Sequence, residues 1–172
     1  DSWKAYLFKT ETTDTICSIR KGIVIDIVNK YERDTIKKAF STHRNKIIIE
    51  HEDGTIAYYK NLVKNTFLVK LGQTVYPQTP LGIMHKSKND MYYFSLTVSY
   101  LANKDYDEII SRSFTKGKSI NKFITPFFYA SSGSFQLQEK TKYIVEFDKS
   151  ILTKEFTKRE LTKYKKHPEL FN

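Results

Sequence analysis

The side chains with the most obvious chemical potential are four histidines, His43, His51, His85 and His167. A neutral imidazole is a common zinc ligand and can transfer a proton near neutral pH. The four show no H-x-H or H-E-x-x-H spacing and no pairing with cysteine, so their spacing predicts no metal site. His51 opens an Asp-Gly turn and is expected to bond nearby backbone. His85 and His167 lie in polar surroundings and are expected at the surface.

Other catalytic groups have no supporting pattern. The one cysteine, Cys17, lies in the apolar run Ile16–Ile19, where a buried thiol acts as a small hydrophobe. Asp26 and Asp53 are available carboxylates, but the turn accounts for Asp53. The six glycines are dispersed and form no phosphate-binding loop. We therefore expect no catalytic residue among these groups.

The stretch from Lys46 to Met84 contains the densest β-structure signals. Three isoleucines are followed by Glu-Asp-Gly and by the strand-favouring run Thr55–Tyr59, which predicts a β-hairpin. Alternation at Phe67, Val69 and Leu71 predicts a half-buried strand. Short strands are also expected at Val75 and at Leu81–Met84, with turns between them. The pattern is typical of a compact antiparallel sheet or flattened barrel.

The order of motifs in this stretch resembles the core of lysostaphin-type (LytM-like) zinc peptidases, over about residues 12–100. The matching segments are His51-Glu52-Asp53-Gly54, Tyr59-Lys60-Asn61-Leu62, Val69–Val75 and Leu81-Gly82. The resemblance implies a mainly β fold, a lysostaphin-like β-sandwich. It also implies where a zinc site would stand. That family holds zinc with a His and an Asp of an early motif and the second His of a late H-x-H strand, and a His in Tyr-x-His-Leu assists.

At the corresponding positions this chain carries other residues. Met91 and Tyr93 stand in the two histidine places of the late strand, and Asn61 stands in Tyr-x-His-Leu. No His or Asp occurs between Ser2 and Thr13. The resemblance thus implies no zinc, no other cofactor and no catalytic residue of the family type. It leaves a candidate cleft lined by Tyr59, Asn61, Met91 and Tyr93, suited to a peptide or glycan chain. For the two tyrosines, ordinary sheet packing is the alternative.

The function implied is a non-catalytic binding or regulatory module at the bacterial cell envelope, secreted or periplasmic, with peptidoglycan or an envelope protein as partner. One alternative is an active zinc endopeptidase whose ligands come from another register or from upstream of Asp1. Another is a purely structural subunit of an envelope complex. A lipoyl or biotinyl carrier domain is a third, since Lys86 lies near the place of the modified lysine, but its neighbours fit poorly.

Length, composition and charge limit these hypotheses. The 172 residues are 40% hydrophobic and 15% aromatic, enough for one domain or one domain with an extension. The net charge of +10 permits an anionic partner, but no basic block is long enough to predict nucleic-acid binding. No apolar stretch is long enough to span a membrane. A start at Asp1 without Met leaves room for an export signal upstream.

We predict two units, residues 1–102 and a β-rich extension, 103–172, that packs on the first. Strands are expected at residues 4–10, 16–19, 23–28 and 91–100, and the apolar run 23–28 is expected to be covered on both faces. Residues 29–45 are expected to form a loop, with some helix at 34–40. Further strands are expected near residues 123–124, 127–129, 135–137 and 143–147. A C-terminal helix, Ser150 to Lys166, should end before Pro168, with Glu155 and Arg159 as a supporting pair.

Overall fold

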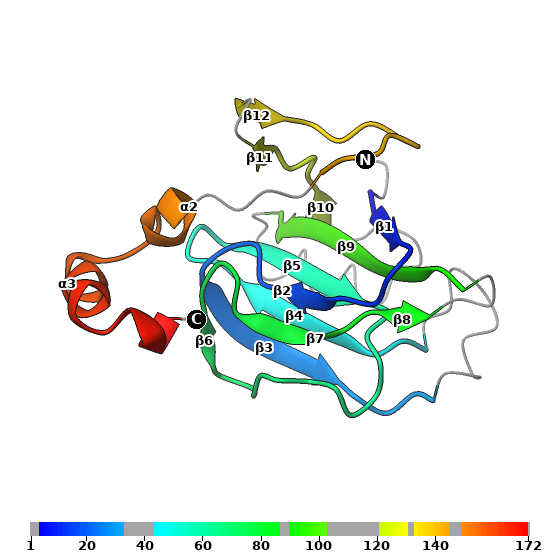
Figure 1. Ribbon diagram of the computed structural model, residues 1–172, viewed down its shortest axis with the longest axis horizontal. Coiled ribbons are helices and arrows are strands. Elements are labelled where there is room, and N and C mark those ends of the chain that lie inside the picture. Colours follow the sequence, from blue (N-terminus) through cyan, green and yellow to red (C-terminus); the bar gives the residue numbers. More distant parts are fainter. Residues whose placement is uncertain are drawn as a thin grey trace.

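A computed structural model describes residues 4–32, 43–86, 90–102, 121–130, 133–144 and 149–171. Antiparallel strands dominate it, and short helices follow them in the sequence (Figure 1). The elements are β1 (Tyr6–Thr10), β2 (Thr15–Cys17), β3 (Gly22–Val28), β4 (Lys46–Glu50), β5 (Thr55–Lys60), β6 (Thr74–Val75), β7 (Pro80–Ile83), β8 (His85–Lys86), β9 (Tyr92–Leu101), β10 (Asn121–Phe123), β11 (Phe128–Ala130), β12 (Gly133–Phe135), α2 (Lys149–Thr153), α3 (Lys158–Lys166) and η2 (Pro168–Phe171). The predicted mainly β class with a C-terminal helix is confirmed.

The largest sheet has eight strands, with the order β1-β9-β5-β4-β3-β6 and with β8 and β10 also paired to β9. Its central hairpin, β4–β5, is the one predicted from the Asp-Gly turn. Gly54 has φ +78°, and Asp53 accepts a hydrogen bond from the Thr55 amide at 3.0 Å. The turn therefore depends on Gly54, which can adopt positive φ without strain, and on the Asp53 side chain, which bonds the backbone two residues further along.

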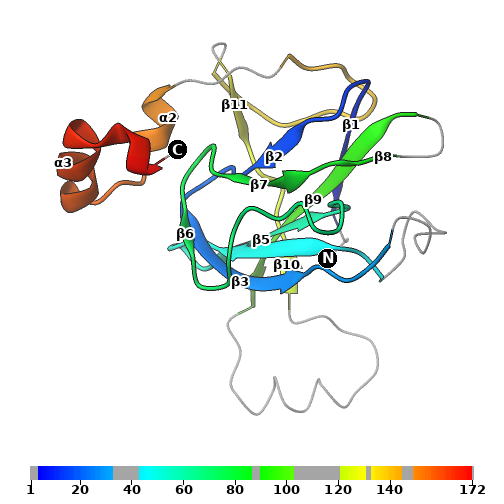
Figure 2. The same ribbon diagram turned by 60° about the horizontal axis from the view of Figure 1, so that its bottom comes forward.

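A second layer, the β2–β7 pair, lies over this sheet (Figure 2). Ile16 and Leu81 from that pair are buried with residues from the large sheet, so the two layers enclose the core. The core cluster is Ile16, Val24, Ile47, Ile49, Ala57, Tyr59, Leu62, Val69, Val75, Leu81, Met84, Leu96 and Val98. Apolar faces of two β layers are buried against one another, as the sandwich prediction requires.

Two strand predictions are wrong in detail. β3 is covered on one face only: Val24 is buried, but Ile23 is 50% and Ile25 41% exposed. Only the Val24 side of β3 faces the second layer. The segment Phe67–Leu71 forms no strand, although Val69 is buried. Turns with positive φ on either side, at Asn65 and Gly72, leave it too short for a ladder.

β9 confirms the predicted strand at residues 91–100. Leu96 and Val98 face the core, opposite Tyr59 and Ala57 of β5. The other face of β9 is polar, yet its members Ser95, Thr97 and Ser99 are buried too. β9 is therefore the strand that most of the sheet is built around, and it pairs with β1, β5, β8 and β10.

The predicted extension joins the first unit through the sheet itself. β10 pairs with the end of β9, and the Ile124 amide donates to the Val98 carbonyl at 3.1 Å. Phe128 of β11 packs edge-on against Phe8 of β1. The proposed boundary near residue 102 lies next to residues 103–120, which are outside the described residues. The predicted helix at 34–40 and the predicted strand residues 145–147 are outside them as well. The described residues 29–32 and 43–45 form no helix or strand, and residues 136–137 and 143–144 lie in no strand.

The prediction of one continuous C-terminal helix is wrong, because the structure divides it into α2 and α3. Thr157 caps α3: its hydroxyl accepts from the Glu160 amide at 3.2 Å, and Glu160 accepts from the Thr157 amide at 2.7 Å. This capping box starts a new helix and ends the old register. Glu155, predicted to pair with Arg159, instead pairs with Arg20. As predicted, the helix ends before Pro168, where η2 begins.

Candidate functional site

Tyr59, the first predicted cleft residue, is a core residue. Its side chain is fully buried between the two layers, and its hydroxyl accepts a hydrogen bond from the Ile19 amide at 3.0 Å. Burial raises the pKa of Tyr59 to about 12, so the phenol stays neutral. The prediction that Tyr59 lines a cleft is wrong, because its ring is used to pack β5 against β2.

Asn61 follows β5 and has the left-handed backbone conformation, φ +70°, that asparagine tolerates better than most residues. Its amide donates to the Asn45 carbonyl at 3.1 Å, and its carbonyl accepts from the His85 amide at 3.0 Å. The side chain is fully buried, yet neither of its amide atoms has a hydrogen-bond partner within the described ranges. Both groups are thus held away from water with their bonding capacity unused.

His85 is a functional candidate that sequence reasoning placed at the surface, wrongly. Only 7% of it is exposed, because β8 lies beside β9 with His85 opposite Tyr93. The two rings meet edge to face, with centroids 5.6 Å apart. The burial of His85 depends on Tyr93, which is eight residues away in the sequence, whereas the polar residues that directly follow His85 indicated a surface position.

Tyr93 is half-buried on β9 and lies between β1 and β8, opposite Lys9 and His85. Burial lowers the pKa of the half-buried Arg44, and the nearby Tyr93 opposes that shift. Asn61, His85, Tyr93 and Arg44 are called the Asn61 cluster below. Met91 is half-buried and lies one residue before β9. Of the four predicted cleft residues, two adjoin His85: the Asn61 carbonyl accepts from its amide, and the Tyr93 ring meets its imidazole.

Among the described residues, no three His, Cys, Asp or Glu side chains lie close enough to hold a metal ion. His167 is exposed, as predicted, and its Nδ1 lies 3.2 Å from Glu169. Exposed His43 contacts the Tyr31 ring, with centroids 5.2 Å apart. The expectation of a site without metal or cofactor remains a prediction.

Cys17 is half-buried rather than buried. Its burial, with the nearby Asp14 adding to the effect, raises the pKa of the thiol. A raised pKa reduces the thiolate that a nucleophile needs. Lys86, the residue weighed for a carrier domain, is at the end of β8 and pairs with Asp90 at 2.8 Å. Neither residue has the setting that its reactive role would require.

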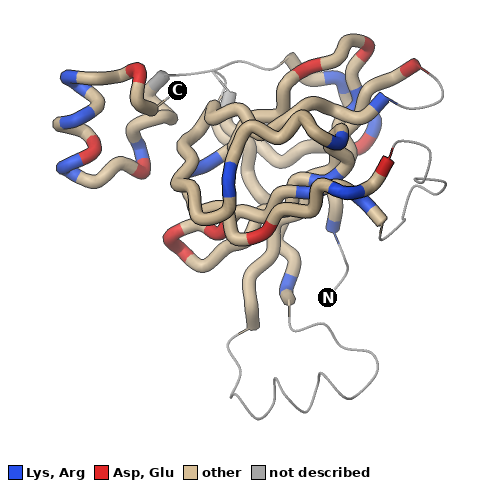
Figure 3. The backbone as a smooth tube through the Cα atoms, turned by 90° about the horizontal axis from the view of Figure 1, so that it is seen from below, with Lys and Arg blue, Asp and Glu red and all other residues tan. Residues whose placement is uncertain are grey.

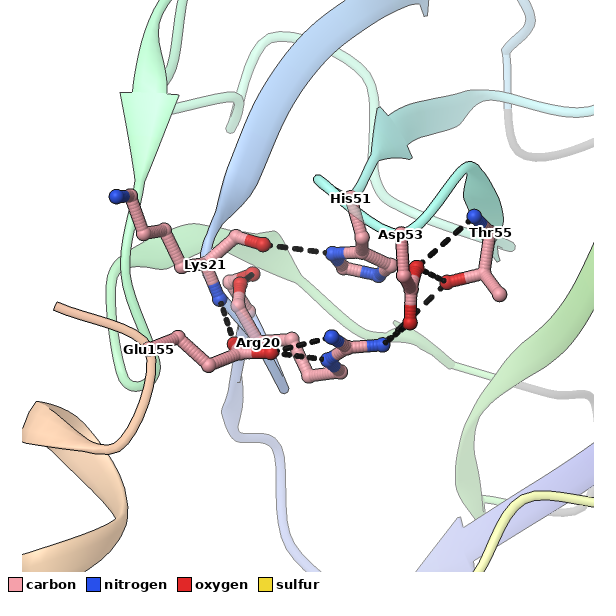
Figure 4. Close-up of polar contacts among 7 residues, drawn as sticks. Arg20, Lys21, His51, Asp53, Thr55 and Glu155 are labelled. Atoms are coloured by element: carbon pink, nitrogen blue, oxygen red, sulfur yellow. Dashed lines mark hydrogen bonds and ion pairs between the residues drawn. The ribbon is translucent and has the colours of Figure 1, made fainter. Parts of the chain in front are cut away.

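A polar network surrounds the β4–β5 turn (Figure 4). His51 is buried, with Nδ1 2.8 Å from the Lys21 carbonyl, which confirms the predicted backbone bond. Burial lowers the pKa of His51, so the ring is neutral near pH 7. Arg20 bonds Asp53 at 2.7 Å and also Glu155 from the far end of the chain. Arg20, Asp53 and Glu155 thus satisfy one another, whereas the buried His51 Nε2 has no hydrogen-bond partner among the described residues.

We call residues 149–171 the C-terminal clasp. Glu155 accepts from the Lys21 amide at 3.0 Å, and Glu160 pairs with Lys21 Nζ at 2.7 Å. The Tyr76 hydroxyl donates to Glu160 at 2.9 Å. Aromatic rings of the clasp, from Phe156, Tyr164 and Phe171, pack around one another and against Tyr76. Ion pairs and a small aromatic cluster together dock the clasp on the turn before β3.

Acid is expected to loosen the clasp. Partial burial alone would raise the pKa of Glu160, but hydrogen bonds from Lys21, Thr157 and Tyr76 lower it from 4.5 to about 2. A pKa depressed by folding stabilises the docked state above the unfolded value, and this stabilisation is lost as pH falls toward the folded value. Hydrogen exchange of the α3 amides should therefore show docking weakening between about pH 4.5 and about pH 2. In Glu160→Gln this step should disappear; an unchanged pH profile would contradict the assignment.

The fold and the site together define a mainly β protein with a large antiparallel sheet, a smaller second layer and a helical clasp. No protein-family model matches the chain, and no curated protein matches it. Among solved structures, the chain is similar to the solution structure of lysostaphin, with 14% identity and a TM-score of 0.43. The match covers 75% of this chain and 52% of that one, so the chain spans about half the length of the lysostaphin structure. None of the described helices has the length and apolar character needed to cross a membrane.

Proposed function

We propose that this protein is a non-catalytic relative of lysostaphin-type zinc peptidases that acts as a binding or regulatory module at the bacterial cell envelope. The observation that carries the proposal is the Asn61 cluster. The motif order of the sequence puts Asn61 and Tyr93 where that family has imidazoles, and His85 adjoins both: its amide donates to the Asn61 carbonyl, and its ring meets that of Tyr93. Neither a carboxamide nor a phenol is a routine zinc ligand.

The cluster has the chemistry to bind a peptide. Asn61 is fully buried, so it supports the cluster through its backbone bonds and does not itself reach a peptide. Tyr93 adds an aromatic face with a hydroxyl. The Arg44 guanidinium is suited to a carboxylate, which it can bind with two parallel hydrogen bonds. A cell-wall peptide carries carboxylates for Arg44 and polar and apolar groups for the Tyr93 ring and hydroxyl.

The test combines metal analysis with binding. Purified protein is analysed for zinc and then sedimented with purified peptidoglycan. We expect no stoichiometric zinc, no hydrolysis and retained binding. Tyr93→Ala should weaken binding by about tenfold, the cost of losing roughly 1.4 kcal/mol. Tyr100→Ala, on the same strand and 39% exposed, is the matched control and should bind as the parent protein does.

The alternatives give different results. One zinc per chain together with peptidoglycan hydrolysis would establish the endopeptidase and overturn the proposal. Neither zinc nor wall binding, with recovery of the chain in an envelope complex, would establish a structural subunit. Equal binding by the Tyr93 and Tyr100 variants would remove the Asn61 cluster from the site.

A further inference from the structure

The outward surface of α3 is cationic. Five of its nine residues, Lys158, Arg159, Lys163, Lys165 and Lys166, are basic and exposed. Figure 3 shows their blue segments along the part of the clasp that lies farthest from the sheets. With 100° between successive helical residues, these five side chains occupy a continuous arc of nearly half the helix circumference.

Two of the three acidic residues of the clasp point the other way; the third, Glu169 in η2, is exposed beside His167. Glu155 is held by Arg20, and Glu160 is held by Lys21 and Tyr76, all on the body of the protein. Ion pairing with the body of the protein therefore uses Glu155 and Glu160 and leaves the basic residues of α3 facing solvent. Solubility alone does not require basic residues to be separated from acidic ones, because a surface with both signs of charge interspersed is also soluble.

The apolar side of α3 is also already in use. Tyr164 contacts Phe156 and Phe171, with ring centroids 5.6 Å and 5.7 Å apart. The docked helix therefore has no free apolar face to insert into a membrane. Its outward arc is convex, and its basic residues are spread around it instead of converging on one point. Such a surface suits many anionic groups arranged in a plane better than a single bound anion or one chain in a groove.

We propose that the exposed basic face of α3 binds the surface of an anionic phospholipid bilayer. Binding is electrostatic and occurs without insertion, because each Lys or Arg near the surface is attracted to the negative headgroups. α3 lies at the edge of the molecule, away from the sheets, so a flat surface can reach it (Figure 1). The proposal is independent of the Asn61 cluster and does not rest on the proposed function.

The test is co-sedimentation with vesicles of phosphatidylcholine alone or with about 30% phosphatidylglycerol. The full chain should bind the anionic vesicles only, and raising the salt from about 0.05 M to about 0.5 M should release it. A variant carrying Lys158→Gln, Arg159→Gln, Lys165→Gln and Lys166→Gln should lose binding by at least about tenfold. Glutamine is a good helix former, and the Thr157–Glu160 capping box is retained, so α3 stays folded.

The matched control removes the same amount of charge at exposed lysines outside α3: Lys9→Gln, Lys70→Gln, Lys122→Gln and Lys142→Gln. We expect less than about a twofold loss from it. Equal losses in the two variants would show attraction by net charge alone and would overturn the proposal. Failure of the parent chain to bind anionic vesicles, or tighter binding to soluble polyglutamate than to vesicles, would overturn it as well.

Discussion

Gly22→Ala is expected to destabilise the protein by about 3 kcal/mol or more, the upper part of the range for overpacking a buried site. A methyl group on Gly22 would lie 2.5 Å from the Glu50 carbonyl oxygen and 2.6 Å from Ile49 Cγ2. Both atoms belong to β4, which pairs with β3 at this point, so neither can move without opening the central sheet. The His51 ring, 2.9 Å away, blocks the remaining side. Denaturant unfolding measures the loss.

Gly82→Ala is the matched control for this substitution. Gly82 is also buried in a strand, but its nearest neighbour would be the Thr66 carbonyl oxygen at 3.4 Å, an ordinary contact. We expect its stability to change by less than about 1 kcal/mol. Similar destabilisation by the two variants would mean that loss of glycine itself, and not the close approach of β4, sets the cost.

Phe171→Ala is the second large effect, and it should open the C-terminal clasp. Phe171 is 4% exposed and contacts the rings of Tyr76, Phe156 and Tyr164. Truncating a buried phenylalanine costs about 3–5 kcal/mol. A helix of nine residues is not stable alone in water, so α3 should unfold once it is undocked. Trypsin should then cut at its lysines, and the α3 amides should lose protection from hydrogen exchange.

Leu170→Ala tests whether the effect comes from the buried ring. Leu170 precedes Phe171 but is 55% exposed, so its truncation should leave the clasp resistant to trypsin. In Phe171→Ala the β4 and β5 amides should stay protected, because their ladder does not include the clasp. Loss of protection throughout the sheet would show instead that clasp and sheet unfold as one unit.

The sequence predicted well what local chemistry determines. The β4–β5 hairpin follows from isoleucines and an Asp-Gly turn, and β9 follows from strict alternation, so both were found. The division of the C-terminal helix was also visible in principle. Thr157-Lys158-Arg159-Glu160 is a capping-box pattern, and attention to the apolar stripe alone missed it.

Features that depend on distant partners were not predictable in this way. Ile23 and Ile25 look like residues of a doubly covered strand, but the second layer covers only the Val24 face of β3, which leaves them exposed. His85 is buried by β9, which alternation of its own neighbours cannot reveal. Arg20 and Glu155 meet across a separation of 135 residues. For the candidate site, the resemblance proposed Asn61 and Tyr93 but gave no sign of His85 and Arg44, whose positions near them depend on the folded sheet.

The contact between the clasp and the turn before β3 also has a consequence for the order of assembly. During synthesis, Arg20, Lys21 and Tyr76 emerge from the ribosome well before Glu155, Glu160 and Phe171. Until then the nascent sheet carries Arg20 paired with Asp53 alone, Lys21 without its carboxylate partner and an uncovered Tyr76 ring at one corner. Closure of that corner is therefore a late step, and a chaperone that recognises basic and aromatic groups would find its binding site there only on unfinished chains.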